Sequence, residues 1–394
     1  MKRAFVSLLI MTLTLTNISL VNITSVQAAT ADNIVTTDKS ATTDDDTLIV
    51  SLENIREIVI ENNISLKIAD NNLKIAKEKR DDAKESFDSK SKPSKSDYTD
   101  ANTGVVDTSA YNSALSNYNT AKSNYESAKE NLTKAKDNYD KNVETVVYSA
   151  QQAYISYLND MATKKISEAT QKYNEKKSDI YKIQYENGFI SKNQYLSKIQ
   201  GDTSVNDLNK SKDTEELNRI KLCNTLGLNP NDKIVFNTDV TVDFNVISHI
   251  NYEKDLAVML DNNQNIKDKK DAIDNLDDQE DTYDNNDQED IYDYEQDNAK
   301  MDLNQTENTA ETDFKALYND LMSSYNSLKN SYEKIMQEQK TFEITQAQYD
   351  YGYMSKNALE NSQITLDKDN ASFIKTRNEC YLKYLKYTQM KEGY

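Results

Sequence analysis

The chain has 394 residues, of which 29% are charged, only six are glycine and only two are proline. A compact globular enzyme of this length needs more of these turn-forming residues, so the composition favours long helices that each bury a narrow apolar stripe. The net charge of -19 argues against nucleic acid as a partner, because phosphate binding requires clustered lysine and arginine.

The N-terminus has the pattern of a secretory signal peptide. Two basic residues precede an apolar run that ends near Val21, and a small-residue cleavage site follows at Ala28. We therefore predict a signal peptide over residues 1–28, with a retained membrane anchor as the alternative. Small polar and acidic residues dominate residues 29–47, which predicts a flexible N-terminal segment.

The first helical pattern begins at Ser51, a candidate N-cap, and continues with apolar residues at helical spacing to about Phe87. Pro93, Gly104 and many small polar residues then indicate a polar connection over residues 88–108. The sequence thus predicts one amphipathic helix followed by a loop.

A strict seven-residue repeat comes next. Its first position holds Tyr111, Tyr118, Tyr125, Leu132, Tyr139 and Val146. The position three residues later holds Ala114, Ala121, Ala128 and Ala135. This period predicts a left-handed coiled coil in which alanine allows close approach of a neighbouring helix. We expect the helix to continue unbroken to Asn187.

Two glycines stand in the same short motif, 164 residues apart. Tyr185-Glu-Asn-Gly-Phe-Ile-Ser191 matches Tyr349-Asp-Tyr-Gly-Tyr-Met-Ser355. In each motif the glycine can end a helix in the left-handed conformation, and the serine can cap the next helix. Each motif therefore predicts a tight reversal, and the first returning helix is expected to run to Leu226, before Gly227.

A second pair of motifs indicates that the chain is duplicated. Ile58-Val-Ile-Glu-Asn-Asn63 matches Val258-Met-Leu-Asp-Asn-Asn263, 200 residues later. We predict two tandem helical repeats, over residues 48–230 and 251–394, joined by a connecting β segment over residues 231–250. The strand signal there is an alternation of apolar and polar residues, with Val240, Val242, Phe244 and Val246 on the apolar side.

The second repeat again contains heptads. They comprise Tyr318, Tyr325 and Tyr332 at one position and Leu321, Leu328, Ile335 and Phe342 at the other. An acidic tract over residues 274–297 precedes them, with 12 carboxylates in 24 residues. We interpret it as a solvated loop. A cation-binding loop is the alternative, although the tract lacks the glycine that an EF-hand turn needs.

The sequence contains few of the residues and motifs on which common catalytic sites depend. His249 is the only histidine, and no glycine-rich phosphate loop is present, so we predict neither an enzyme nor a cofactor or metal site. His249 is interpreted as a surface or joint residue. Cys223 and Cys380 could form a disulfide in an exported chain, and sequence leaves that question open.

Taken in order, these motifs resemble the TolC-like outer-membrane efflux protein family over residues 48–394. The resemblance rests on the Leu52–Asn63 opening, the Ala153-Tyr154 helix, the two reversals and the Leu222–Gly227 ending of the first repeat. The predicted fold class is mainly α, with long antiparallel coiled-coil hairpins in two repeats. Family members carry membrane strands where residues 88–108 and 277–300 lie here, and neither stretch has the outward apolar face that such strands need.

The resemblance implies a homotrimer whose helices form a conduit in the cell envelope, classed with outer-membrane proteins. It also implies docking to an adaptor protein and, through the adaptor, to an inner-membrane pump. The adaptor-docking tip would comprise Gly188, Phe189, Ile190, Ser191, Gly352, Tyr353, Met354 and Ser355. The predicted function is therefore that of an efflux or secretion channel component. A structural coiled-coil protein of the cell surface, without transport, is the alternative.

Overall fold

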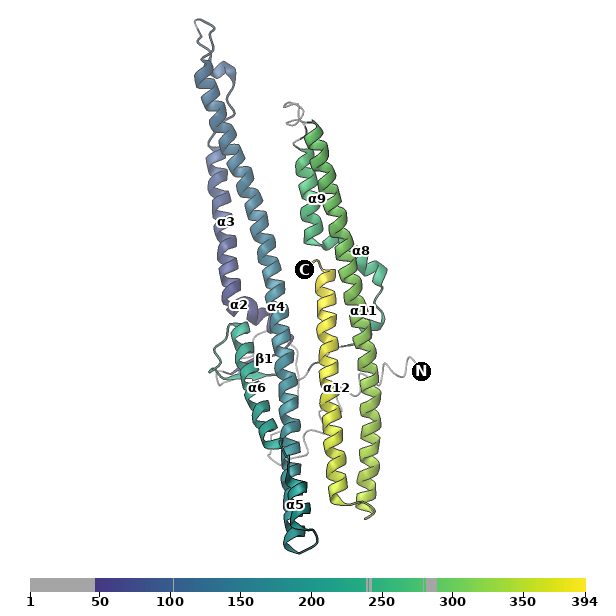
Figure 1. The fold of residues 1–394 in the computed structure, drawn as a ribbon. Coiled ribbons are helices and arrows are strands. Elements are labelled where there is room, and N and C mark those ends of the chain that lie inside the picture. Colours follow the sequence, from purple (N-terminus) through teal and green to yellow (C-terminus); the bar gives the residue numbers. More distant parts are fainter. Residues whose placement is uncertain (1–46, 102, 239, 241–242, 279, 281–288) are drawn as a thin grey trace, which may run out of the picture. The chain divides into compact units, whose positions relative to one another are not determined.

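The computed structural model describes residues 47–101, 103–238, 240, 243–278, 280 and 289–394 (Figure 1). The predicted signal peptide and all but the last residue of the predicted N-terminal segment lie outside these residues. Helices dominate the described part of the chain, which confirms the mainly α fold class with long helical hairpins.

The described elements are, in chain order, β1 (Leu48–Val50), α2 (Ile55–Asn62), α3 (Ile64–Asp88), the 3-10 helix η1 (Lys95–Tyr98), α4 (Thr108–Glu186), α5 (Lys192–Ile199), α6 (Ser204–Leu226), β2 (Ile234–Phe236), α7 (Asn245–Ser248), α8 (Tyr252–Asn262), α9 (Gln264–Asp277), α11 (Glu289–Asp350) and α12 (Lys356–Lys391).

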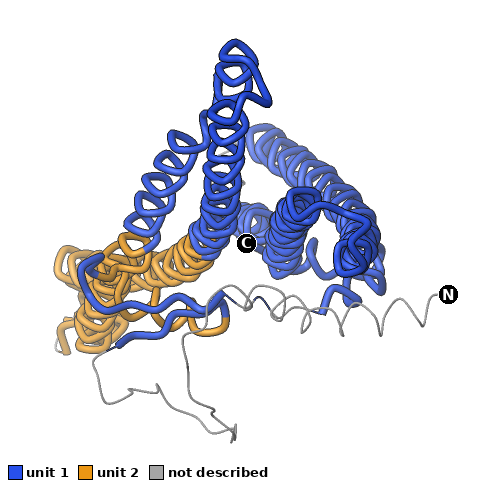
Figure 2. Tube along the Cα trace, turned by 90° about the horizontal axis from the view of Figure 1, so that it is seen from below, with its two compact units in different colours: residues 1–52, 151–222, 229–394 blue, residues 53–150, 223–228 orange. Residues whose placement is uncertain are grey.

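Two compact units can be distinguished (Figure 2). Of the described residues, those within 47–52, 151–222 and 229–394 form unit 1, and those within 53–150 and 223–228 form unit 2. Helix α4 has 79 residues and contributes to both units. It runs unbroken to Glu186, so the predicted long helix is confirmed to within one residue of its expected end at Asn187.

In unit 1, the predicted heptads of α11 form the core against α12. The heptad side chains Leu321, Tyr325, Leu328 and Tyr332 are at most 3% exposed. At the end of this row the rings of Phe314 and Tyr387 stack with their centroids 4.8 Å apart. The seven-residue pattern therefore identified the buried face of α11 correctly.

In unit 2, α3 packs against the first part of α4. The ring of Phe87 lies 5.5 Å from that of Tyr118 and 5.9 Å from that of Tyr125. Ala121, between these two tyrosines, is buried. Small alanines and tyrosine rings thus alternate along the contact, as a coiled-coil seam requires.

A short parallel sheet completes unit 1. Leu48, Ile49 and Val50 of β1 pair with Ile234, Val235 and Phe236 of β2. The hydroxyl of Tyr154, on α4, lies 3.0 Å from the carbonyl oxygen of Val50. The same carbonyl oxygen accepts the N–H of Asn237, at 2.8 Å, so the hydroxyl of Tyr154 adds a second hydrogen bond to it and joins α4 to the end of the sheet.

The predicted helix from Ser51 to Phe87 is wrong at its start and in its interior. β1 and a turn come first, helix α2 begins at Ile55, and Asn63 separates α2 from α3. Asn63 is extended, and its side-chain oxygen accepts the N–H groups of Ser65 and Leu66, at 2.9 and 3.2 Å. Asparagine ends one helix here and caps the next, which apolar spacing alone does not reveal.

The end of α6 packs against this break. The side-chain amide of Asn63 donates to the carbonyl oxygen of Thr225, at 2.8 Å. Gly227 follows α6 with a φ of +75°, and a Cβ atom there would lie 2.3 Å from the carbonyl oxygen of Asn62. Gly227 therefore ends the helix, as predicted, and also leaves room for the backbone of residue 62.

The same arrangement occurs in unit 1 at the break between α8 and α9. Asn263 has φ and ψ angles of -59° and 117°, close to those of Asn63, and its side-chain oxygen accepts the N–H of Ile266, at 3.2 Å. A Cβ atom at Gly393, which has a φ of +99°, would lie 2.3 Å from the carbonyl oxygen of Asn262.

The strand predicted around Val240 to Val246 is also wrong. Among the described residues of the predicted β segment 231–250, the strand is β2, at residues 234–236, and residues 245–248 form the short helix α7. Val240, Phe244 and Ile247 are each 2% exposed, whereas Val246 is 47% exposed. Val246 and Ile247 are neighbours in α7, and it is Ile247, on the other side of the predicted alternation, that is buried with Phe244 in the core. Val242 lies outside the described residues.

Two further predictions need correction. The returning helix after the first reversal is divided by residues 200–203, where Gly201 has a φ of +86°. Both ends of the acidic tract are helical, although the whole tract was predicted to be a loop: α9 continues to Asp277 and α11 begins at Glu289. Tyr292 in α11 donates to Asp277 at 3.1 Å, which holds the two helices together close to their ends. Most of the tract between these helices lies outside the described residues.

Candidate docking site

The first reversal joins α4 to α5. Gly188 has a φ of +74° and its N–H donates to the carbonyl oxygen of Tyr185, at 3.0 Å. The N–H of Phe189 donates to the carbonyl oxygen of Gln184, at 2.8 Å. This pair of hydrogen bonds is the Schellman motif, which ends a helix by means of a residue in the left-handed conformation.

The second reversal joins α11 to α12 with the same bonds. Gly352 has a φ of +80° and donates to the carbonyl oxygen of Tyr349, at 2.9 Å. The N–H of Tyr353 donates to the carbonyl oxygen of Gln348, at 2.8 Å. Both predicted glycine caps are confirmed.

Serine caps the helix that leaves each reversal. The hydroxyl of Ser191 accepts the N–H of Gln194, at 3.3 Å, and the side chain of Gln194 accepts the N–H of Ser191, at 2.8 Å. The hydroxyl of Ser355 accepts the N–H of Ala358, at 3.2 Å. Both predicted serine caps are confirmed, and the first is a complete capping box.

The residues at the turn of each reversal face solvent. Phe189 is 80% exposed and Tyr353 is 84% exposed, and Met354 is also exposed, whereas Ile190 is half-buried. A Cβ atom at Gly188 or Gly352 would meet nothing within 4 Å, so these glycines are required for their φ and not for space. Each turn thus presents an aromatic side chain on a rigid backbone.

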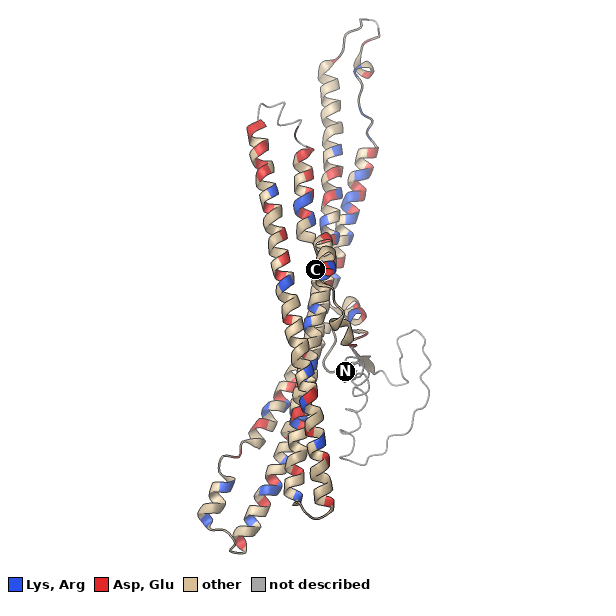
Figure 3. Cartoon of the chain, turned by 90° about the vertical axis from the view of Figure 1, so that its right-hand side faces the viewer, with Lys and Arg blue, Asp and Glu red and all other residues tan. Residues whose placement is uncertain are grey.

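We define hairpin one as residues 172–198 and hairpin two as residues 336–362, which match at the offset of 164 residues. Both belong to unit 1, and Lys176 forms an ion pair with Glu360 at 3.0 Å between them. Hairpin one holds six lysines and three carboxylates, a net charge of +3. Hairpin two holds two lysines and four carboxylates, a net charge of -2 (Figure 3).

The sides of hairpin one carry a cluster that the sequence did not single out. The rings of Tyr185 and Tyr195 stack with their centroids 5.3 Å apart, which joins α4 to α5. The Nζ atoms of Lys198 and Lys177 lie 4.5 and 5.9 Å from the centroid of the Tyr181 ring. A tyrosine four residues before the stacked one was the available signal, because residues four apart share a helix face.

Hairpin two has small neutral residues at the matching positions. Thr345 stands where hairpin one has Tyr181, is 9% exposed, and donates to the carbonyl oxygen of Thr341, at 2.8 Å. Thr341 and Ser362 replace the two lysines of the cluster. The two reversals therefore share a backbone but offer different chemistry to a partner.

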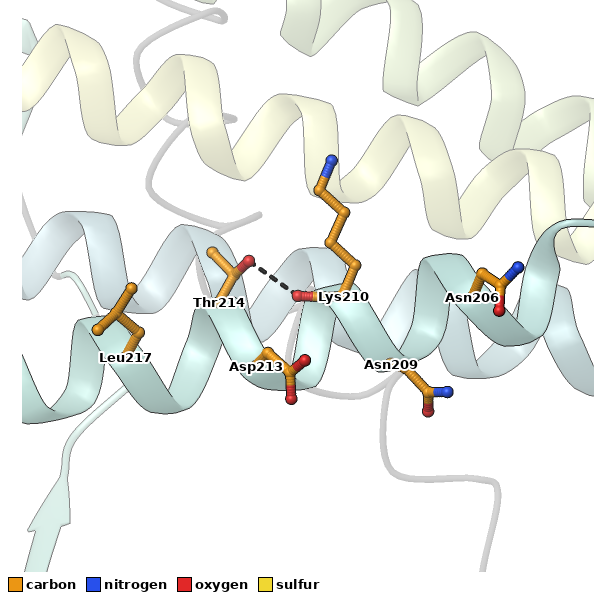
Figure 4. A pocket seen from close by; sticks show the side chains of 6 residues that line it. All are labelled: Asn206, Asn209, Lys210, Asp213, Thr214 and Leu217. Atoms are coloured by element: carbon orange, nitrogen blue, oxygen red, sulfur yellow. Dashed lines mark hydrogen bonds between the residues drawn. The ribbon is translucent and has the colours of Figure 1, made fainter.

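A hollow on the surface of the described residues offers no enclosed site. An open hollow of about 390 Å³ lies along α6 and is lined by Asn206, Asn209, Lys210, Asp213, Thr214 and Leu217 (Figure 4). All six residues come from one helix, and Thr214 donates to the carbonyl oxygen of Lys210 at 2.8 Å within that helix. A ligand there would lie on a convex surface, which offers little burial.

The remaining candidate groups are accounted for structurally. In the part of the chain that is described, no group of three His, Cys, Asp or Glu side chains is placed to hold a metal ion. His249 is exposed and its Nδ1 contacts the carbonyl oxygen of Asn245 at 2.8 Å, so the predicted surface position is confirmed. Cys223 and Cys380 are both buried thiols, and burial raises the pKa of Cys380 to about 11.

None of the helices within the described ranges combines the length and the apolar character that crossing a membrane requires.

Comparison with known proteins identifies the fold. No protein-family model matches the chain, and no curated protein sequence is detectably similar to it. Solved structures do match. CusC, studied for transmembrane channel formation, is 11% identical with a TM-score of 0.56, over 87% of this chain and 92% of its own. The outer membrane protein VceC of Vibrio cholerae is 12% identical with a TM-score of 0.54, over 87% and 96%.

The open state of the MtrE outer membrane channel of Neisseria gonorrhoeae is also similar. It is 12% identical with a TM-score of 0.53, over 87% of this chain and 89% of its own. The chain therefore has the fold of TolC-like outer-membrane channels along most of its length, and the resemblance predicted from the motifs is confirmed at the level of the fold.

Proposed function

We propose that the chain is a component of an exported, TolC-like conduit in the cell envelope that docks an adaptor protein of an efflux or secretion assembly. The observation that carries the proposal is the matched pair of reversals. Both use the same Schellman bonds and a serine cap, and both expose an aromatic side chain by 80% or more. Rigid aromatic residues on an exposed turn are typical anchors of protein interfaces.

We infer that the docking surface comprises the eight predicted residues, four at each reversal. Through the adaptor, the conduit would connect to an inner-membrane pump. The two tandem repeats, over residues 48–230 and 251–394, are part of the same proposal. The matched breaks at Asn63 and Asn263, each with a glycine packed against the preceding residue, support a duplicated origin.

Self-association is supported by exposed apolar side chains on α3. Ile64, Ile68 and Ile75 are 71%, 56% and 52% exposed. They are spaced by four and seven residues and so lie on one face of the helix. A row of exposed isoleucines is costly in water, and other copies of the chain would cover it in a homotrimer.

The mass of the purified chain in solution tests the conduit. A trimer is expected from multi-angle light scattering of the chain without residues 1–28, since one or two copies are too few to enclose a channel. A stable monomer would favour the alternative, a structural coiled-coil protein of the cell surface without transport.

Docking is tested by co-purification of the chain with an adaptor protein that is expressed together with it in the same cells. Phe189→Ala combined with Tyr353→Ala should remove most of the adaptor from the complex, because both exposed anchors are lost. Tyr294→Ala is the control, since Tyr294 is 70% exposed on α11 but far from the reversal in sequence. Unchanged adaptor recovery with the double variant would contradict docking at the reversals.

A further inference from the structure

The difference in charge between the two hairpins is concentrated around the ring of Tyr181 in hairpin one. Lys177 of α4 and Lys198 of α5 both lie beside the ring of Tyr181, as described above. Neither lysine forms an ion pair with any residue in the described ranges, whereas Lys176 is already paired with Glu360. Two positive charges thus share one aromatic ring without a carboxylate to compensate them.

We propose that Lys177, Tyr181 and Lys198, which we name the lysine–tyrosine cluster, bind the acidic face of a helical segment in a partner protein. A glutamate carboxylate placed near the two ammonium groups is attracted by both, and charge-assisted hydrogen bonds fix its position. The Tyr181 ring offers apolar area to the methylene stem of that glutamate. The inference rests on the proposed function, because it specifies the chemistry of the partner that docks at hairpin one.

The position of the cluster favours an elongated partner over a flat membrane surface. Lys177 precedes Gly188 by 11 residues, which places it about 16 Å back along α4 at the helical rise of 1.5 Å per residue. Electrostatic screening at physiological salt acts over about 8 Å. A membrane that touches Phe189 would therefore attract the cluster only weakly, whereas a helix lying along hairpin one reaches both.

Hairpin two provides an internal comparison. Its threonines and serine at the matching positions carry no charge, and its net charge is -2. An acidic helix should therefore distinguish hairpin one from hairpin two, although the backbones of their turns are alike. The partner would contact the two reversals with chemically different surfaces.

A defined peptide probes the cluster without an identified partner. The probe is a fluorescent, alanine-based helical peptide with glutamates four residues apart, and its twin carries glutamines instead. We expect fluorescence anisotropy at low salt to show binding of the glutamate peptide alone to the full chain. Lys177→Gln with Lys198→Gln should weaken this binding about tenfold, the effect of losing two exposed ion pairs.

The matched control removes two exposed lysines from hairpin two, as Lys340→Gln with Lys356→Gln, and should leave binding unchanged. A charge-reversed variant separates loss of the binding site from loss of folding. Lys177→Glu with Lys198→Glu should bind a lysine version of the peptide more tightly than the unchanged chain does, and a misfolded chain would not gain this binding. Absence of glutamate-peptide binding, or equal weakening by the two glutamine variants, would overturn the inference.

Vesicles of phosphatidylglycerol and phosphatidylcholine test the membrane as a competitor. Co-sedimentation that is lost specifically in the Lys177→Gln/Lys198→Gln variant would overturn the assignment to a protein partner. These outcomes are separable from the proposed function. A chain that is monomeric but still binds the peptide through the cluster contradicts the conduit alone, and a trimer that ignores the peptide contradicts the cluster alone.

Discussion

The two reversals have nearly the same backbone and quite different surfaces. Gly188 and Gly352 adopt φ angles of +74° and +80° and make corresponding hydrogen bonds. Around them, hairpin one has a net charge of +3 and hairpin two a net charge of -2, and the positions of Lys177, Tyr181 and Lys198 in hairpin one are held by threonines and a serine in hairpin two. A tight turn depends on few residues, so the remaining positions of the hairpin are free to change with the partner.

The glycines at the other ends of the returning helices are under a different constraint. Gly188 and Gly227 have almost identical φ angles, +74° and +75°, but only Gly227 lies against another backbone segment. Left-handed glycines are therefore of two kinds here, those that need only the conformation and those that also need the missing side chain. Matched substitutions distinguish the two kinds.

The largest effect is expected for Gly227→Ala. The added methyl group would lie 2.3 Å from the carbonyl oxygen of Asn62 and would force the backbone apart. With the cost of the left-handed conformation, the variant should lose about 3 kcal/mol or more of stability. The midpoint of urea-induced unfolding, followed by far-UV circular dichroism, measures the loss.

Gly188→Ala is the control for this substitution, because the φ is the same and the space is open. It should cost only about 1 kcal/mol, from the conformational strain alone. If both variants unfold at the same urea concentration, the close approach of Asn62 is not what selects glycine at position 227.

A smaller effect is expected at the two asparagine breaks. Asn63 accepts two backbone N–H groups and donates to the carbonyl oxygen of Thr225, whereas Asn263 accepts one N–H and has no corresponding backbone acceptor within the described contacts. Asn63→Ala should therefore cost about 2 kcal/mol and Asn263→Ala about 1 kcal/mol. Urea midpoints of the two variants make the comparison, and an equal loss would mean that the bond to Thr225 contributes nothing.

Long-range regularity made much of the fold predictable. The heptads at Tyr325 and Tyr332 identified the buried face of α11, because a helix must bury the same stripe over many turns. The reversals at Gly188 and Gly352 were predictable because glycine and serine each perform one local task there. The low glycine content also helped, because in a chain with only six glycines each one is informative about a turn or a helix end.

The missed features depend on single contacts between distant segments. The start at Ile55 and the break at Asn63 follow from a sheet and a helix end that lie far away in sequence. The short helix α7 was mistaken for a strand because alternation and helical spacing both fit so few residues. The cluster around Tyr181 was missed because it depends on a contact across the reversal: Lys198, on α5, reaches the ring of Tyr181, on α4, only after the chain has turned back.

The smallest predicted difference concerns the two serine caps. In Ser191→Ala the side chain of Gln194 can still accept the N–H of residue 191, so half of the capping box survives. In Ser355→Ala nothing equivalent remains, because residue 358 is alanine. Each serine cap is worth about 1 kcal/mol, and the loss should be smaller at Ser191.

Hydrogen exchange of the first-turn amides of α5 and α12 measures these losses locally, where an unfolding curve of the whole chain would not resolve them. Ser355→Ala should speed exchange in the first turn of α12 more than Ser191→Ala does in that of α5. Adding Gln194→Ala to Ser191→Ala should remove the difference. If exchange rises equally in the two single variants, the glutamine contributes nothing to the first reversal, and the two turns are as alike in stability as they are in backbone.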